Sequence, residues 1–216
     1  MRQNTWLINS TKNLLPLSQS QSFLEAIKSE WFFEGRAIDL GTPSADCQLC
    51  NHEAIRYQFE IHNQLTDNKL LIGSSCIKRF GIKYKSSDGT TYTMDATMYE
   101  VNQARKDAIQ ARLILCKEKV LDDLVLLRKN ITDSNVDVQS FIDNYNRFSA
   151  FTPKQLAFVT SLLEQYHILY DISNYVVATR TYQQQSDINT LNDLQYNRIV
   201  GALSLKQRKY RLRKAA

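Results

Sequence analysis

Alternation of apolar and polar residues predicts a β-hairpin in the N-terminal half of the chain. Residues 55–61 (Ile-Arg-Tyr-Gln-Phe-Glu-Ile) alternate with the period of a half-buried strand. Turn-forming residues follow at 65–68, and residues 69–72 (Lys-Leu-Leu-Ile) return as the partner strand. Residues 1–17 have no regular period, so we expect them to be irregular. Residues 84–94 fit either a second small hairpin or a loop.

Apolar residues before the hairpin recur at helical spacing. Ser20 or Ser22 can cap a helix that includes Trp31 and Phe32 and ends at Gly35. The aromatic residues of this helix are expected to pack against the hairpin.

The second half of the chain is predicted to be helical throughout. Apolar residues recur at helical spacing from about Asp95 to Asn130. The run Thr152-Pro-Lys-Gln155 is typical of a helix start, because Thr can cap, Pro suits the first helical position and Gln can reach back to the cap. A last helix is expected at 186–213. The chain is therefore predicted to be α+β and predominantly α-helical.

Three cysteines bracket the predicted hairpin. Cys47 and Cys50 form a Cys-x-x-Cys pair before the first strand, and Cys76 follows the second strand at the start of a short helix. Such a pair places two sulfurs on one ion, and Cys76 closes the site as the second half of a treble-clef-like zinc fold does. A tetrahedral zinc ion needs a fourth ligand, which His52 or His62 can supply. We favour His52 because it lies two residues past Cys50.

These elements divide the chain into two predicted domains. Residues 1–94 hold the N-terminal helix and the zinc-binding hairpin module. Residues 95–216 form a helical domain that ends in a basic tail.

Other interpretations of the cysteines are free buried thiols, since Cys is among the most buried residue types, and a redox pair. The redox pair is disfavoured because no strand precedes the Cys-x-x-Cys and no helix follows it. Four protein ligands would fill the coordination sphere of the zinc ion and leave no position for water, which argues against hydrolysis at the metal. The sequence has no Gly-rich phosphate loop or nucleophile motif. We therefore expect a non-enzymatic protein with Zn2+ as its cofactor and no small-molecule substrate.

Composition places the chain among ordinary soluble proteins, with 43% hydrophobic and 23% charged residues. It contains no apolar run as long as a membrane span, and its N-terminus lacks a signal-peptide core. We expect a cytoplasmic protein without a membrane partner, in which the thiols stay reduced.

The formal charge of +5 is concentrated at the C-terminus. Without six basic tail residues, 21 of the 27 basic residues remain against 22 acidic ones. Such a tail attracts nucleic acid, anionic lipid or an acidic protein surface, although it also suits a solvated helix end. The six residues are Lys206, Arg208, Lys209, Arg211, Arg213 and Lys214.

A second basic group follows the third cysteine. It has two rings, Phe80 and Tyr84, interleaved with its cations. Cations that contact phosphates, beside rings that stack on bases, are typical of nucleic-acid binding. The alternative is that Phe80 packs in the core and the cations are merely exposed. The basic residues of this group are Lys78, Arg79, Lys83 and Lys85.

Residues 47–63 together with 72–80 resemble a small zinc-binding module found in uncharacterised proteins of bacteriophages, plasmids and other mobile elements. The run 151–156 (Phe-Thr-Pro-Lys-Gln-Leu) is similar to a helix opening found downstream in some of them. This resemblance implies a zinc ion and a mobile-element setting. A more distant resemblance, in size and in the Cys-x-x-Cys module, is to the zinc-finger-bearing large-subunit-like protein of plasmid-borne type IV CRISPR complexes.

The sequence thus predicts a non-enzymatic, zinc-binding protein that contacts DNA or RNA through its two basic groups, in a phage, plasmid or CRISPR-type process. The alternative is a protein-interaction module, such as an adaptor or an inhibitor of a host defence complex. Acidic and basic surface groups would then serve a protein partner.

Overall fold

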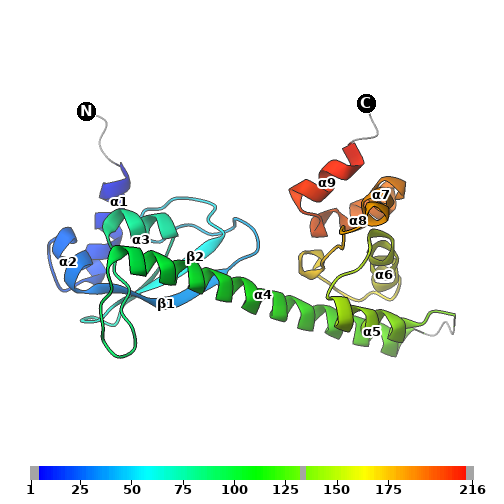
Figure 1. Cartoon of the computed structure of the whole chain (residues 1–216), viewed down its shortest axis with the longest axis horizontal. Coiled ribbons are helices and arrows are strands. Elements are labelled where there is room, and N and C mark those ends of the chain that lie inside the picture. Colours follow the sequence, from blue (N-terminus) through cyan, green and yellow to red (C-terminus); the bar gives the residue numbers. More distant parts are fainter. Residues whose placement is uncertain (1–4, 132–134, 213–216) are drawn as a thin grey trace. The chain divides into compact units, whose positions relative to one another are not determined.

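The computed structural model of the protein describes residues 5–131 and 135–212. They form many helices and one small three-stranded sheet (Figure 1), which confirms an α+β, predominantly α-helical chain. The elements before the long helix are α1 (Thr5–Leu14), η1 (Leu15–Leu17), α2 (Phe23–Ser29), β1 (Trp31–Asp39), β2 (Tyr57–Asn63), β3 (Lys69–Ile72) and α3 (Ser74–Phe80). From the long helix onward they are α4 (Met94–Asn130), α5 (Val138–Phe148), α6 (Pro153–Gln165), η2 (Ile172–Asn174), α7 (Tyr182–Thr190), α8 (Asp193–Ile199), η3 (Val200–Ala202) and α9 (Leu205–Leu212).

The chain packs as two units, residues 1–113 and 114–216, and the boundary between them falls inside α4. Each unit has its own apolar core. The division predicted from the sequence, between residues 94 and 95, lies at the first turn of α4.

The sheet of the first unit confirms the predicted hairpin and adds a strand to it. β2 pairs with β3 in antiparallel register, with Ile61 opposite Leu70. On its other side β2 pairs with β1, with Phe33 opposite Ile61. Phe33 and Ile61 are fully buried, so the face that they share belongs to the core of the unit.

The prediction that Trp31 and Phe32 belong to a helix ending at Gly35 is wrong. The helix α2 stops at Ser29, and both aromatic residues lie in β1. Aromatic side chains suit a half-buried strand, and Trp31 is completely buried there. Gly35 has a φ of +92° and lies where the register of β1 with β2 shifts, as expected for glycine at a bulge.

The expectation that residues 1–17 are irregular is also wrong for the described part of that segment. Residues 5–14 form α1, and its last residue, Leu14, is completely buried. The end of η1 is tied to the β2–β3 turn, because the carbonyl oxygen of Leu17 accepts hydrogen bonds from Thr66 and Asn68. Residues 84–93 form a loop with two isolated bridges, one between Tyr84 and Phe33 and one between Lys85 and Thr91, and Met94 begins α4.

Side-chain hydrogen bonds cap the N-termini of α6 and α8 in the second unit. Thr152 and Gln155 form the predicted capping box at the start of α6. The predicted single helix over 186–213 is wrong, because the chain breaks into α7, α8, η3 and α9. Asn192 starts α8 with a capping box of its own after an extended Leu191. Over residues 5–131 and 135–212, no helix combines the length and apolarity needed to cross a membrane.

Candidate metal centre

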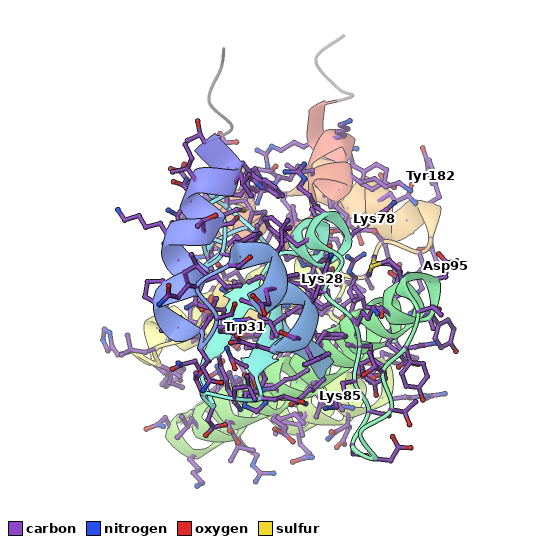
Figure 2. The ribbon with its side chains drawn as sticks, turned by 90° about the vertical axis from the view of Figure 1, so that its left-hand side faces the viewer. Lys28, Trp31, Lys78, Lys85, Asp95 and Tyr182 are labelled. Atoms are coloured by element: carbon purple, nitrogen blue, oxygen red, sulfur yellow. The ribbon has the colours of Figure 1, made fainter. Side chains whose placement is uncertain are left out.

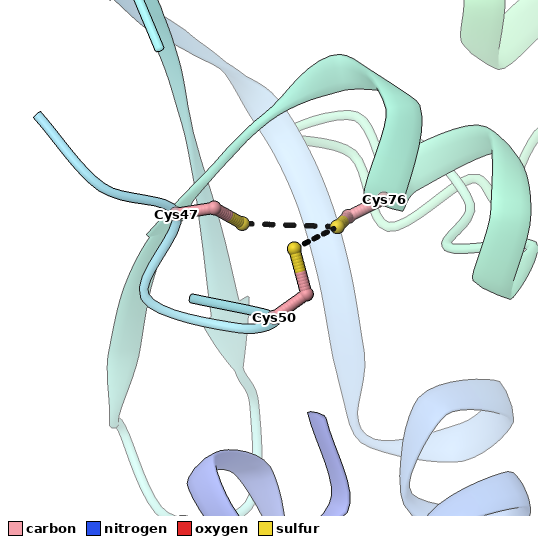
Figure 3. Close-up of side chains that lie close together, drawn as sticks. All are labelled: Cys47, Cys50 and Cys76. Carbon is pink, nitrogen blue, oxygen red and sulfur yellow. Dashed lines mark hydrogen bonds between the residues drawn. The ribbon is translucent and has the colours of Figure 1, made fainter. Parts of the chain in front are cut away.

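Three cysteine side chains meet at one end of the sheet (Figure 3). Cys47 and Cys50 lie in the loop between β1 and β2. Cys76 lies in the first turns of α3, which follows β3 after a single residue, Gly73. The antiparallel hairpin therefore returns the chain to its starting end and brings Cys76 back to the Cys-x-x-Cys loop.

The sulfur positions fit a tetrahedral metal site. Cys47 Sγ lies 3.7 Å from Cys76 Sγ, and Cys76 Sγ lies 3.4 Å from Cys50 Sγ. An ion with metal–sulfur bonds of about 2.3 Å in a tetrahedron separates its sulfurs by about 3.8 Å. All three cysteines are buried and none forms a disulfide. This cluster can therefore hold a metal ion after small side-chain movements.

Hydrogen bonds to Cys47 stabilise the thiolate form of its side chain. A sulfur–sulfur hydrogen bond with Cys76 is the largest of the interactions that together lower the pKa of Cys47 to about 5, although burial acts in the opposite direction. Hydrogen bonds from the backbone N–H groups of Cys50, Gly73 and Leu49 contribute to this lowering. The pKa of Cys76 is raised, because its thiol is hydrogen-bonded with the Cys47 sulfur and because it is buried. Without a metal, the cluster thus favours one thiolate stabilised by neighbouring donors.

The two histidines considered as fourth ligand lie in different surroundings. His62 has both ring nitrogens bonded to carboxylates, Nδ1 to Glu34 at 3.2 Å and Nε2 to Asp67 at 2.7 Å. This engagement argues against His62 as the ligand. His52 is exposed and lines the same pocket as the three thiols. Among the described residues, however, the group of converging metal-ligand atoms consists of the three sulfurs alone.

The pocket over the thiols has a volume of about 210 Å³. Apart from the cysteines and His52, its wall includes the indole of Trp6 and the side chain of Arg79. The Arg79 guanidinium carbon lies 3.9 Å from the centre of the Trp6 ring, and that ring stacks on Phe80 at 4.3 Å. Phe80 also packs edge-on against Phe23 and is partly buried against the core of the unit, as the alternative to a base-stacking role expected.

Helix α1 is hydrogen-bonded to the loop that carries Cys47 and Cys50, which we call the metal loop. Asn13 Nδ2 donates to the carbonyl oxygen of Leu49 at 3.0 Å and to Asn51 Oδ1 at 2.8 Å. Asn9 Nδ2 makes a longer bond of 3.4 Å to the carbonyl oxygen of Cys50. No local sequence pattern predicts these contacts, because they join residues more than 35 positions apart.

The basic residues that follow Cys76 do not form one patch. Lys78, Arg79 and Lys83 are exposed. Lys85 is only half-exposed, lies 5.1 Å from the centre of the Phe32 ring and donates to Gln64. Figure 2 shows the labelled Lys78 and Lys85 well apart. Lys85 therefore belongs to a different surface from Lys78.

The basic C-terminal residues lie mostly in a docked helix rather than in a free tail. In α9, Arg211 pairs with Asp193 and covers the Tyr196 ring at 4.1 Å. The Nε of Arg208 donates to the carbonyl oxygen of Leu203. Lys206 and Lys209 are exposed, whereas Arg213 and Lys214 lie outside the described residues.

Comparison with protein-family models, with curated proteins and with solved structures found no match. The resemblance to a mobile-element zinc module therefore stays a prediction.

Proposed function

We propose that the protein is a zinc-binding, non-enzymatic protein that contacts nucleic acid through the surface beside its metal centre. Zinc is the favoured ion because it takes thiolates in tetrahedral sites and is the usual occupant of Cys-x-x-Cys modules. Its role here is to hold the loop of Cys47 to α3, which connects the two ends of the hairpin. No carboxylate in the described residues lines the pocket with the thiols, which supports a structural role.

One observation carries the nucleic-acid proposal. Arg79 is exposed, lies over the Trp6 ring, and has no hydrogen-bonded or ion-paired partner among the described residues. The adjacent Lys78 is exposed on the same helix. A free guanidinium stacked on a ring can bind a phosphate with its N–H groups while it presents a flat face to a base.

The side-chain partners of the predicted contact residues favour some of these residues over others. Arg208 and Arg211 have partners inside the second unit, and Lys85 lies on another surface. We therefore propose Lys78, Arg79 and Lys83 as the main contacts, with the exposed Lys206 and Lys209 as a second set.

The test compares two charge-matched double variants in their affinity for labelled single-stranded DNA, duplex DNA and RNA. Lys78→Gln/Arg79→Gln removes the proposed contacts. Lys129→Gln/Arg147→Gln removes the same charge elsewhere, and Arg147 also lies over a ring, that of Phe148. For duplex DNA, loss of two phosphate contacts should reduce the magnitude of the slope of log K against log salt concentration by about 1.8.

The proposal requires the first variant to bind more weakly than the control at low salt, with a difference that shrinks as the salt concentration rises. Equal affinity of the two variants would refute it. Capture of a protein from lysate that survives nuclease treatment, combined with no affinity for any of the three nucleic acids, would instead favour the protein-interaction alternative.

The C-terminal set needs point variants rather than a deletion. Gln207 on α9 donates to the carbonyl oxygen of Val177, so removal of residues 206–216 would disturb the second unit itself. Lys206→Gln/Lys209→Gln removes two exposed charges and leaves this bond in place.

A further inference from the structure

The metal centre contains fewer protein ligands than a closed site needs. Among the described residues, three sulfurs are the only His, Cys, Asp or Glu atoms that converge closely enough to share an ion. The nearest nitrogen donor by sequence, His52, is exposed and lines the pocket, but its ring nitrogens are not among these converging atoms. A tetrahedral ion on the three sulfurs would therefore direct its fourth position into the pocket.

The pocket at that fourth position has room for a small molecule. Its volume of about 210 Å³ exceeds the roughly 150 Å³ of an engineered protein cavity that admits benzene. Trp6, Gly73 and Ser75 are among the residues that line the pocket. A ligand of a few heavy atoms fits this space, whereas a folded segment of another protein does not.

The chemistry of the wall favours a particular class of ligand. An ion already bound by three thiolates is soft and prefers a fourth sulfur to an oxygen. Three thiolates on a divalent ion give a net charge of −1, so a fourth thiolate needs a nearby cation. Arg79 supplies that cation, and its planar guanidinium is suited to bind a carboxylate on the same ligand through two hydrogen bonds.

We propose that the fourth coordination position of the zinc is open and binds the sulfur of a small acidic thiol, whose carboxylate pairs with Arg79. On binding, the thiol loses its proton to solvent, a zinc–sulfur bond forms and a zinc-bound water leaves. This inference rests on the proposed zinc site and adds a ligand to it.

The experiment uses the full-length protein loaded with cobalt(II), whose absorption reports the number of sulfur ligands and the coordination geometry. The thiols are 3-mercaptopropionate, which carries a carboxylate, and 2-mercaptoethanol, which does not. Wild-type protein should gain thiolate-to-cobalt absorption with both thiols. It should bind mercaptopropionate at least about tenfold more tightly, as a charge-assisted pair with Arg79 requires.

Variants separate the contributions to this binding. Arg79→Gln should abolish the preference for mercaptopropionate, while Arg147→Gln, a matched loss of an exposed arginine over a ring, should retain it. His52→Ala should leave the cobalt spectrum of the thiol-free protein unchanged. Circular dichroism of each variant checks that the fold is retained.

Each other outcome overturns a stated part of the inference. A wild-type spectrum that does not respond to thiols but changes in His52→Ala shows that His52 closes the site. Equal affinity for the two thiols, unaffected by Arg79→Gln, removes the role of the acidic group. If wild-type protein binds neither cobalt nor zinc, the zinc site of the proposed function fails, and the open position fails with it.

Discussion

Replacement of Cys76 by serine tests the metal centre most directly. Cys76 is 3% exposed, and its sulfur lies within 3.7 Å of both other sulfurs in the cluster. Serine has nearly the same shape, so the hairpin and α3 should still form. What the variant loses is one of three soft ligands. The matched control is Cys116→Ser, which alters a buried cysteine of α4 whose thiol donates to Asn174 instead.

The expected effect on stability follows from linkage. An ion that binds only the folded state stabilises it by about 2.7 kcal/mol when free zinc exceeds the dissociation constant by 100-fold. Loss of a residue that merely orients a metal ligand costs about 10- to 100-fold in affinity, so loss of a ligand should cost at least about 100-fold. At the same free zinc concentration, Cys76→Ser would then retain only about 0.4 kcal/mol of this stabilisation.

Tryptophan fluorescence can follow this change in the first unit alone. The chain has two tryptophans, Trp6 and Trp31, and both lie in residues 1–113. Urea unfolding would be measured for each protein with buffered free zinc and with a chelator. We expect a large zinc-dependent rise in the midpoint for wild type and for Cys116→Ser, and a small one for Cys76→Ser. The zinc content of purified wild-type protein should be one ion per chain.

Two results would refute the reasoning. In the first, zinc stabilises wild type no more than Cys76→Ser, so that the cluster does not bind the ion in the folded state. In the second, Cys116→Ser loses the zinc response as completely as Cys76→Ser, so that the response does not come from the cluster.

Three further substitutions test single interactions. Burial alone would raise the pKa of Glu30, but hydrogen bonds from three N–H donors outweigh it and lower the pKa below its ordinary value of 4.5. Because the folded pKa is the lower one, this stabilisation is present above pH 4.5 and is lost as the pH falls through the folded pKa. Glu30→Gln should therefore lower the free energy of unfolding of the first unit in urea by about 1.5–3 kcal/mol at neutral pH, relative to the control Glu53→Gln at an exposed position. This difference between the two variants should vanish in acid, where Glu30 is protonated. A difference that does not change with pH would contradict the reasoning. Asn13→Ala removes the bond to the Leu49 carbonyl and should weaken cobalt binding in a titration, whereas unchanged affinity would show that α1 does not support the metal loop. Thr152→Ala removes the cap of α6 and should lower the free energy of unfolding, followed by circular dichroism, by about 1 kcal/mol. Both tryptophans lie in the first unit, so an equal change in the unfolding followed by tryptophan fluorescence would contradict two separate units.

The parts of the fold that the sequence predicted are those with local causes. The alternation in residues 55–61 predicted β2, because the period of a strand is set by its own backbone. The capping box of Thr152 and Gln155 predicted the start of α6, because all its hydrogen bonds lie within four residues. The spacing of the three cysteines predicted the cluster, because the hairpin between them is itself regular.

The parts that it missed depend on residues far apart in the chain. β1 exists because β2 offers it a partner edge, with Phe32 opposite His62, and the run Trp31-Phe32-Phe33 has no alternation to reveal that pairing. Trp6 reaches the metal pocket from a position more than 40 residues before the first cysteine. Sequence spacing alone predicted His52 as the fourth ligand, and this stays a prediction, with His52 lining the pocket of the three thiols.

Arg79 connects the two proposals for the metal surface. It is exposed and lacks a partner in the described chain, yet it also lines the pocket above the three thiols. A single guanidinium that makes two hydrogen bonds to a carboxylate cannot make the same two bonds to a phosphate. If both proposals hold, an acidic thiol in the pocket must weaken nucleic-acid binding, and nucleic acid must weaken thiol binding by the same factor, because coupling between two binding equilibria is reciprocal. 2-Mercaptoethanol lacks the carboxylate, so it should occupy the metal without this effect.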